Sequence, residues 1–241
     1  MKLLRRHKYS LIALAIYWPL VFTLTHIPVR QLAQQTGMSD KTMHVMAYFA
    51  LTFLVWCAVS PYRRVQWNSA KTWWVIAAVA LYGAFDEIVQ GMVGRSADFH
   101  DYIANLFGIA FAMGVLSVFH FWAALLTASV TSIFVISNLS HLTGLYPQYH
   151  LNTLFHFSAY AGLSLIWIQH MERYLRLRQN RTLWLLAAPA LPLAMLTLVL
   201  AAAPLYNKMV WWPDVATAVF GIFAAIVVSR LTFVVMQHRN R

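Results

Sequence analysis

The sequence predicts an all-α polytopic membrane protein whose roughly eight transmembrane helices form two parallel four-helix repeats. Of its 241 residues, 61% are hydrophobic and 10% are charged, and the mean hydropathy is +0.60. Soluble domains carry about 25% charged residues. The apolar runs reach the roughly 20 residues that a helix needs to cross a bilayer core about 30 Å thick. They are too long and continuous for the strands of a barrel, the other structure that can span a membrane.

Eight apolar runs are expected to form the spans. In order, they cover residues 9–25, 42–60, 73–90, 101–119, 122–139, 151–171, 183–203 and 214–233. The first run lacks a small-x-small cleavage site, which favours a retained helix over a signal peptide. The fourth and fifth runs are nearly continuous, so a tight turn is expected at residues 120–122. Three prolines should kink or end the seventh span, namely Pro189, Pro192 and Pro204.

Loop charges predict the orientation of the chain. Of the eighteen Lys and Arg residues, fourteen fall on one side of the eight-span arrangement, and the other side holds only Arg30, Lys41, Arg95 and Lys208. Because cytoplasmic loops are enriched in Lys and Arg, both termini are expected in the cytoplasm. The basic balance is therefore mainly a topology signal, and the expected partner is the lipid bilayer, with no nucleic acid.

An internal repeat divides the chain into two predicted halves, residues 1–121 and 122–241. Residues 40–48 recur as residues 152–160 at an offset of 112, and residues 101–109 recur as residues 214–222 at an offset of 113. Each half has four spans, so the repeats should be parallel and related by an axis along the membrane normal. The second copy is degenerate where the first is rich. Three polar positions of the first half, Asp86, Glu87 and Gln90, fall on Val199, Leu200 and Ala203.

Five of the seven carboxylates gather in the first half, at the predicted outer ends of its spans. Helical spacing places Asp40, His44 and Tyr48 on one helix face, and Asp101 and Asn105 on another. Facing inward, these side chains would line a polar pocket at the level of the outer headgroups. The alternative is an ion-pair and capping network that only fixes the helix ends, because ionisable groups near a membrane must be paired or functional.

Three sequence blocks in this region resemble the VanZ-like family of bacterial membrane proteins. They are Lys41-x-x-His44, Asp86-Glu87-x-x-Gln90, and Gly94-Arg95-Ser96 followed by Asp101, Asn105 and Gly108. The resemblance covers roughly residues 16–116, and the family is named for a protein of a gene cluster associated with resistance to the glycopeptide teicoplanin. It implies a bacterial cytoplasmic membrane protein but no particular reaction. The second half resembles the family weakly, so it is interpreted as a structural partner.

The leading functional hypothesis is binding of a polar cell-envelope ligand, such as a lipid headgroup, a lipid-linked glycan or a glycopeptide. The family resemblance adds a link to glycopeptide resistance as part of this hypothesis. The expected binding residues are Lys41, His44, Asp86, Glu87, Gln90, Arg95, Asp101 and Asn105. The basic groups would engage anionic groups, and the acids would orient sugars or amines. An enzyme is the first alternative, with catalytic candidates Asp86, Glu87 and His44 as acid–base groups. A transporter and a structural assembly protein are the others.

No metal or cofactor is predicted. A metal site could be drawn from several scattered ligands, His44, Asp86, Glu87, His100 and Asp101. However, the chain has no compact ligand motif such as His-Glu-x-x-His, no Gly-rich phosphate loop and no Gly-x-Ser-x-Gly elbow. Well-marked hydrolase, kinase and nucleoside-triphosphatase classes are therefore disfavoured.

Overall fold

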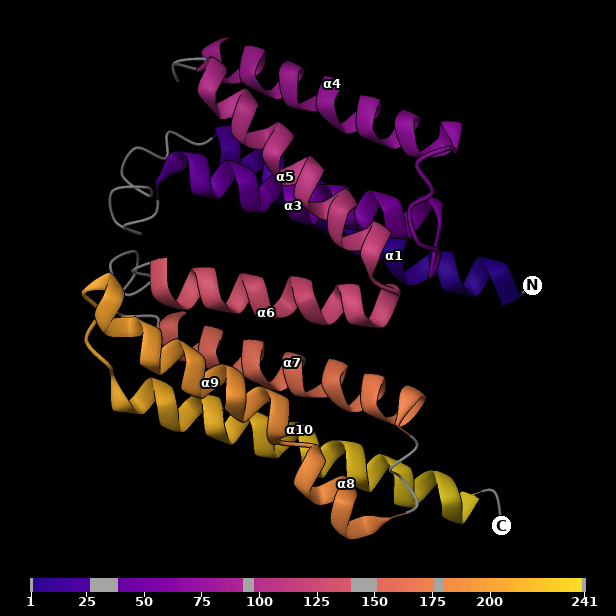
Figure 1. Cartoon of the computed structure of the whole chain (residues 1–241), viewed down its shortest axis with the longest axis vertical. Coiled ribbons are helices and arrows are strands. Elements are labelled where there is room, and N and C mark those ends of the chain that lie inside the picture. Colours follow the sequence, from indigo (N-terminus) through magenta and orange to yellow (C-terminus); the bar gives the residue numbers. More distant parts are fainter. Residues whose placement is uncertain (1, 27–38, 93–97, 140–150, 176–179, 240–241) are drawn as a thin grey trace. The chain divides into compact units, whose positions relative to one another are not determined.

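The computed structural model describes residues 2–26, 39–92, 98–139, 151–175 and 180–239, and every regular element among them is a helix. The predicted all-α fold class is confirmed. The chain forms two compact units, Met1–Ala124 and Leu125–Arg241, referred to as unit 1 and unit 2. Figure 1 shows the helices of each unit.

Unit 1 contains α1 (Lys2–His26), α3 (Asp40–Val59), α4 (Ala70–Met92) and α5 (Phe99–Val118). The helices α6 (Phe121–Leu139), α7 (Leu151–Tyr174), α8 (Arg181–Ala187), α9 (Ala190–Ala202) and α10 (Trp212–Arg239) follow, with a 3₁₀ turn, η4 (Ala203–Tyr206), after α9. Each predicted span therefore corresponds to helix in the described part of the chain.

Six helical segments among the described residues are long and apolar enough to cross a membrane, so the chain is a multi-pass membrane protein. They are Asp40–Val59, Ala70–Met92, Phe99–Val118, Phe121–Asn138, Arg181–Tyr206 and Trp212–Val235. Two predicted spans differ from this set. Helix α1 has a shorter apolar stretch, Lys8–Thr23, and α7 is helical but is not among the six.

The two expected irregularities are both present. Helix α5 ends at Val118 and α6 begins at Phe121, so the turn lies at residues 119–120, slightly earlier than predicted. The seventh span is broken where Pro189 caps α9, and Pro204 lies at the start of η4. Pro192 lies inside α9 without ending it. These breaks follow because proline lacks a backbone N–H and clashes with the preceding helical turn.

Helix α4 has an apolar outer face and a polar inner face. Leu81, Phe85 and Ile88 are exposed, whereas Asp86 and Gln90 are each only 1% exposed. This distribution is the reverse of that on a surface helix of a soluble protein. It fits a helix that faces lipid on one side and a polar bundle interior on the other.

Helices α3 and α5 pack closely because α5 has a glycine where they meet. A methyl group at Gly108 would lie 2.9 Å from the Phe49 backbone nitrogen and even closer to the Val45 carbonyl oxygen. No side chain fits in that space, so only glycine allows this approach. In unit 2, a methyl group at Gly221 of α10 would lie 2.5 Å from the Phe157 carbonyl oxygen of α7.

We predict that Gly108→Ala destabilises the protein by about 1–3 kcal/mol, because overpacking forces backbone shifts. The measurement is thermal unfolding of the purified protein in detergent. Gly114→Ala is the matched control, since a methyl group added at Gly114 of α5 would have no neighbouring atom within 4 Å. The control should be neutral or stabilising by up to about 1 kcal/mol, because alanine is the better helix former. Equal stability of the two variants would contradict this account of the α3–α5 contact.

Candidate functional site

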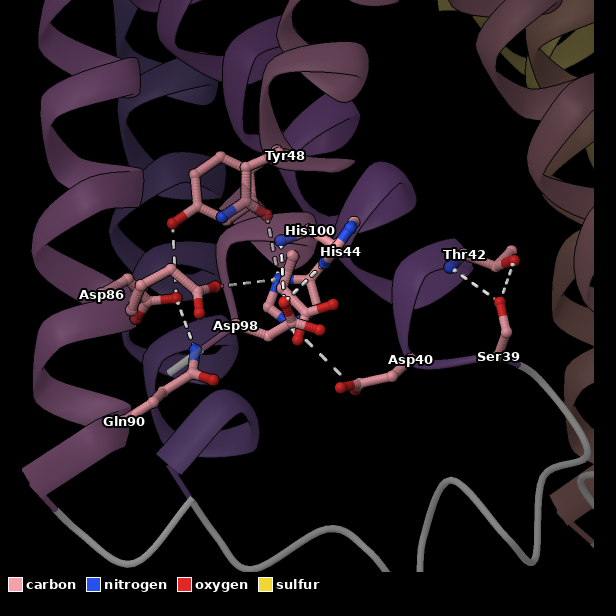
Figure 2. A network of polar contacts seen from close by, with 12 residues as sticks. Ser39, Asp40, Thr42, His44, Tyr48, Asp86, Gln90, Asp98 and His100 are labelled. Atoms are coloured by element: carbon pink, nitrogen blue, oxygen red, sulfur yellow. Dashed lines mark hydrogen bonds and ion pairs between the residues drawn. The ribbon is translucent and has the colours of Figure 1, made fainter. Parts of the chain in front are cut away.

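The polar residues of unit 1 converge from three helices (Figure 2). His44 lies in the second turn of α3, Asp86 and Gln90 lie near the end of α4, and Asn105 lies in the second turn of α5. All four side chains are buried. The convergence follows from the tight α3–α5 contact together with the inward polar face of α4.

Side chains cap the N-termini of α3 and α5, the two helices that contain most of the site residues. The Ser39 hydroxyl accepts a hydrogen bond of 3.1 Å from the Thr42 backbone N–H at the start of α3. The Asp98 carboxylate accepts one of 2.9 Å from the His100 backbone N–H at the start of α5. These are the usual roles of Ser and Asp at helix N-termini. Asp40 and Asp101 lie in the first turns of the same helices, where the helix dipole stabilises negative charge.

His44 is the centre of the site. Its Nδ1 lies 2.9 Å from Asn105 Oδ1 and 3.7 Å from Glu87 Oε1. Its Nε2 lies 4.0 Å from both Asp40 Oδ1 and Asp101 Oδ2. Because Oδ1 only accepts hydrogen bonds, the contact with Asn105 requires a proton on Nδ1. One imidazole therefore lies among three carboxylates that come from three different helices.

A second group of contacts surrounds Asp86. Its Oδ2 accepts hydrogen bonds from the Tyr48 hydroxyl at 3.3 Å and from Gln90 Nε2 at 3.0 Å. Tyr48 and Asp86 thereby link α3 to α4. Because both donors lie within the unit, this carboxylate is stabilised internally.

Several polar atoms of the site are buried without a hydrogen-bond partner among the described residues. They are both carboxylate oxygens of Glu87 and the Nδ2 of Asn105. Such atoms cost free energy when buried, so most have a partner in the protein or in a bound molecule. The Glu87 oxygens accept and the Asn105 amide donates. Together they offer both kinds of hydrogen bond to a third group.

The rim of the site is more exposed. The Asp40 side chain is 39% exposed, and Lys41 is exposed. Asp98 and His100 form an exposed pair, with 2.9 Å between Asp98 Oδ1 and His100 Nδ1. The His100 backbone N–H and then its side chain hold the pKa of Asp98 below its usual range, so this cap is ionised at neutral pH.

The sequence-predicted binding residues separate into groups in the structure. His44, Glu87, Asp101 and Asn105 form the central cluster, and Asp86 with Gln90 forms the neighbouring helix-linking group. Lys41 lies at the exposed rim, and Arg95 lies outside the described residues.

Asp40 and Tyr48 contact the site but are absent from the predicted binding set. Their spacing from His44, four residues on either side, was the available signal.

Asp40, His44 and Asp101 also form a group in which one ligand atom from each lies within 4.8 Å of the others. One imidazole and two carboxylates can bind a divalent cation. His44 Nε2 lies 4.0 Å from each carboxylate oxygen, which is farther than the roughly 3.5 Å between two ligand atoms that bind one cation at about 2.1 Å. The absence of a metal stays a prediction.

Comparison with known proteins places this site in a family. A family model described as VanZ/LLP1 matches residues 4–122. The N-terminal half of the chain belongs to the VanZ/LLP1 family. The match spans α1, α3, α4 and α5 and so includes the whole polar cluster. No curated protein and no solved structure matches the chain. Unit 1 is called the VanZ/LLP1 unit from here on.

The cluster of the VanZ/LLP1 unit can act chemically in two ways. His44 between carboxylates can hold or transfer a proton, because one ring nitrogen of an imidazole can donate a proton while the other accepts one. The surplus of buried carboxylates over nearby described cations also favours a bound group that donates hydrogen bonds, such as an ammonium or a hydroxyl.

We predict that Tyr48→Phe destabilises the VanZ/LLP1 unit by about 1–3 kcal/mol, because Asp86 loses a donor while it remains buried. Thermal unfolding in detergent measures the effect. Tyr160→Phe is the matched control: this tyrosine is equally buried in unit 2, but its hydroxyl has no hydrogen-bond partner among the described residues. The control should be neutral or slightly stabilising. A loss of stability that is equal in both variants would refute the role given to the Tyr48–Asp86 bond.

Proposed function

We propose that the chain binds a polar cell-envelope ligand at the outer face of the bacterial cytoplasmic membrane, and that the cluster around His44 is its site. The observation that carries this proposal is the pair of Glu87 oxygens, which are buried without hydrogen-bond partners among the described residues, beside the unpartnered Asn105 amide. A network that served only to fix helix ends would be expected to satisfy these atoms internally.

The proposed location rests on charge and on the position of the site along the helices. Fourteen of the eighteen Lys and Arg residues fall on the side that would be cytoplasmic. The cluster lies at the start of α3 and α5 and at the end of α4. With both termini in the cytoplasm, these ends face the cell exterior, where lipid headgroups and cell-wall precursors are found.

The site residues divide their roles in this proposal. Glu87 and Asp101 accept hydrogen bonds from ammonium or hydroxyl groups of the ligand, and Asn105 donates to it. Asp86 does not contact the ligand in this proposal, because its carboxylate already accepts hydrogen bonds from Tyr48 and Gln90. The ligand approaches past Asp40, the most exposed carboxylate of the cluster. Lys41 at the rim and Arg95 in the sequence supply positive charge for an anionic group of the same ligand.

A soluble peptidoglycan fragment, a disaccharide carrying a short peptide, tests the binding proposal. We expect it to raise the unfolding temperature of the purified protein, because a ligand that binds only the folded state stabilises it. Glu87→Gln should weaken binding roughly tenfold or more, since a charge-assisted hydrogen bond is lost. Teicoplanin serves as a second probe, since a link to glycopeptide resistance is supported only by the family.

The matched control for this experiment is Glu172→Gln, the same change in α7 of unit 2. It should bind the probes as the unchanged protein does. Arg95→Ala tests the cationic part of the proposal. Binding of either probe with the same affinity in the unchanged protein, Glu87→Gln and Arg95→Ala would rule out this site.

A second candidate function is acid–base catalysis on an envelope lipid or glycan. The observation that favours it is the placement of His44 with one nitrogen near Glu87 and the other near Asp40 and Asp101. Such pairs hold an imidazole in a fixed orientation for proton transfer. A transporter is less well supported, because the described polar residues of the cluster lie near one end of the helices, whereas transporter sites lie near the bilayer midplane.

The catalytic candidate predicts product formation from a radiolabelled envelope lipid incubated with the purified protein. His44→Gln should reduce the rate at least about a hundredfold, the usual contribution of general acid–base catalysis. His100→Gln is the control, since this histidine is exposed and pairs only with Asp98 among the described acids. Turnover that is retained in His44→Gln at equal protein level would leave binding as the function.

A further inference from the structure

Unit 2 contains a cavity of about 430 Å³ that is separate from the His44 cluster. It lies among α6, α7, α9, η4 and the start of α10, and its polar wall includes Asn138, Asn152, His156, Lys208 and Asp214. This volume is within the range of about 300–1,000 Å³ that small-molecule sites occupy. No site was predicted from the sequence in this half of the chain.

The polar wall of the cavity offers unpaired hydrogen-bonding atoms. Three atoms in residues that line it, Ser137 Oγ, Asn138 Oδ1 and His156 Nδ1, are buried without a partner among the described residues. Asn138 is only 2% exposed. Three unpaired atoms in residues around one cavity are a set that a bound polar molecule can satisfy.

The cavity also has one charge of each sign. The Lys208 ammonium donates a hydrogen bond to the Ser137 carbonyl oxygen. The Asp214 carboxylate accepts hydrogen bonds from the Asn152 amide and the Thr153 hydroxyl. Burial lowers the pKa of Lys208, and the charge of Asp214 opposes this shift. An anionic group beside Lys208 would stabilise its charged form further.

The alignment of the two halves explains why unit 2 has an open space here. In that alignment Asp86, Glu87 and Gln90 of the first half fall on Val199, Leu200 and Ala203, and these three residues line the cavity. A glutamine is replaced by an alanine, and two acids are replaced by apolar side chains. The change removes polar side chains that occupy the first-half site and leaves a cavity with an apolar wall.

We propose that this cavity binds the headgroup of a zwitterionic aminophospholipid. The phosphate lies near Lys208, and the ammonium lies near Asp214 and Asn138 Oδ1. The apolar wall receives the start of the lipid chains. One charge of each sign in the cavity wall matches a phosphate and an ammonium joined by a short linker, whereas a purely anionic headgroup would meet Asp214 unfavourably. This site is independent of the function proposed for unit 1.

Native mass spectrometry of the full chain, released from nanodiscs of phosphatidylethanolamine and phosphatidylglycerol, tests the proposal. We expect retained phosphatidylethanolamine in preference to phosphatidylglycerol. Ala203→Gln refills the cavity with the side chain found at Gln90, and it should reduce the retained lipid roughly tenfold. Lys208→Gln, a change between η4 and α10, should do the same. Soluble phosphoethanolamine and inorganic phosphate, added separately, distinguish a lipid headgroup from a free phosphate compound.

Ala201→Gln is the matched control, because it makes the same substitution at an exposed position of α9. This variant should retain the lipid, and so should Lys71→Gln, which removes a cation of unit 1 outside the His44 cluster. Unchanged lipid retention in both Ala203→Gln and Lys208→Gln would overturn the proposal. Equal retention of phosphatidylglycerol, or displacement of the lipid by inorganic phosphate alone, would overturn its zwitterionic selectivity.

Discussion

Burial of carboxylates in an apolar helical bundle is the constraint on which the rest of the VanZ/LLP1 unit depends. Asp86, Glu87 and Asp101 are each less than 10% exposed in a chain with only seven acids. Each buried charge needs donors or an opposite charge nearby. The close α3–α5 contact brings His44 and Asn105 to these acids, and the capped helix starts place Asp40 and Asp101 where the helix dipole stabilises them. The polar site and the helix packing are therefore one structure.

Much of the fold could be predicted from the sequence because hydrophobic length and periodicity are strong signals in membrane proteins. The helices follow the predicted spans, and Pro189 and Pro204 break the seventh one. The turn between α5 and α6 lacks Gly and Pro, so its position could be predicted only from helix length. The two-unit division falls inside α6, at residue 124, whereas the repeat suggested residue 121.

The sequence predicts which side chains of the candidate site share a helix face, but not which side chains bond to each other. Helical spacing correctly groups His44 with Tyr48 on α3 and Asp101 with Asn105 on α5. It cannot show that Tyr48 bonds to Asp86 while His44 bonds to Asn105, since those pairings depend on how three helices are rotated against each other. The cavity of unit 2 was not predicted for a related reason. Val199, Leu200 and Ala203 carry no polar signal in the sequence, and the polar residues of the cavity wall lie on other elements of the unit.

The two faces of α4 have a consequence for the rotation of this helix. Successive residues of an α-helix lie about 100° apart around its axis, and the buried acids Asp86 and Glu87 are flanked directly by the exposed Phe85 and Ile88. A turn of α4 by a single residue position would bring a carboxylate into the hydrocarbon and an aromatic ring into the polar cluster. The burial pattern therefore constrains the angular setting of this helix tightly.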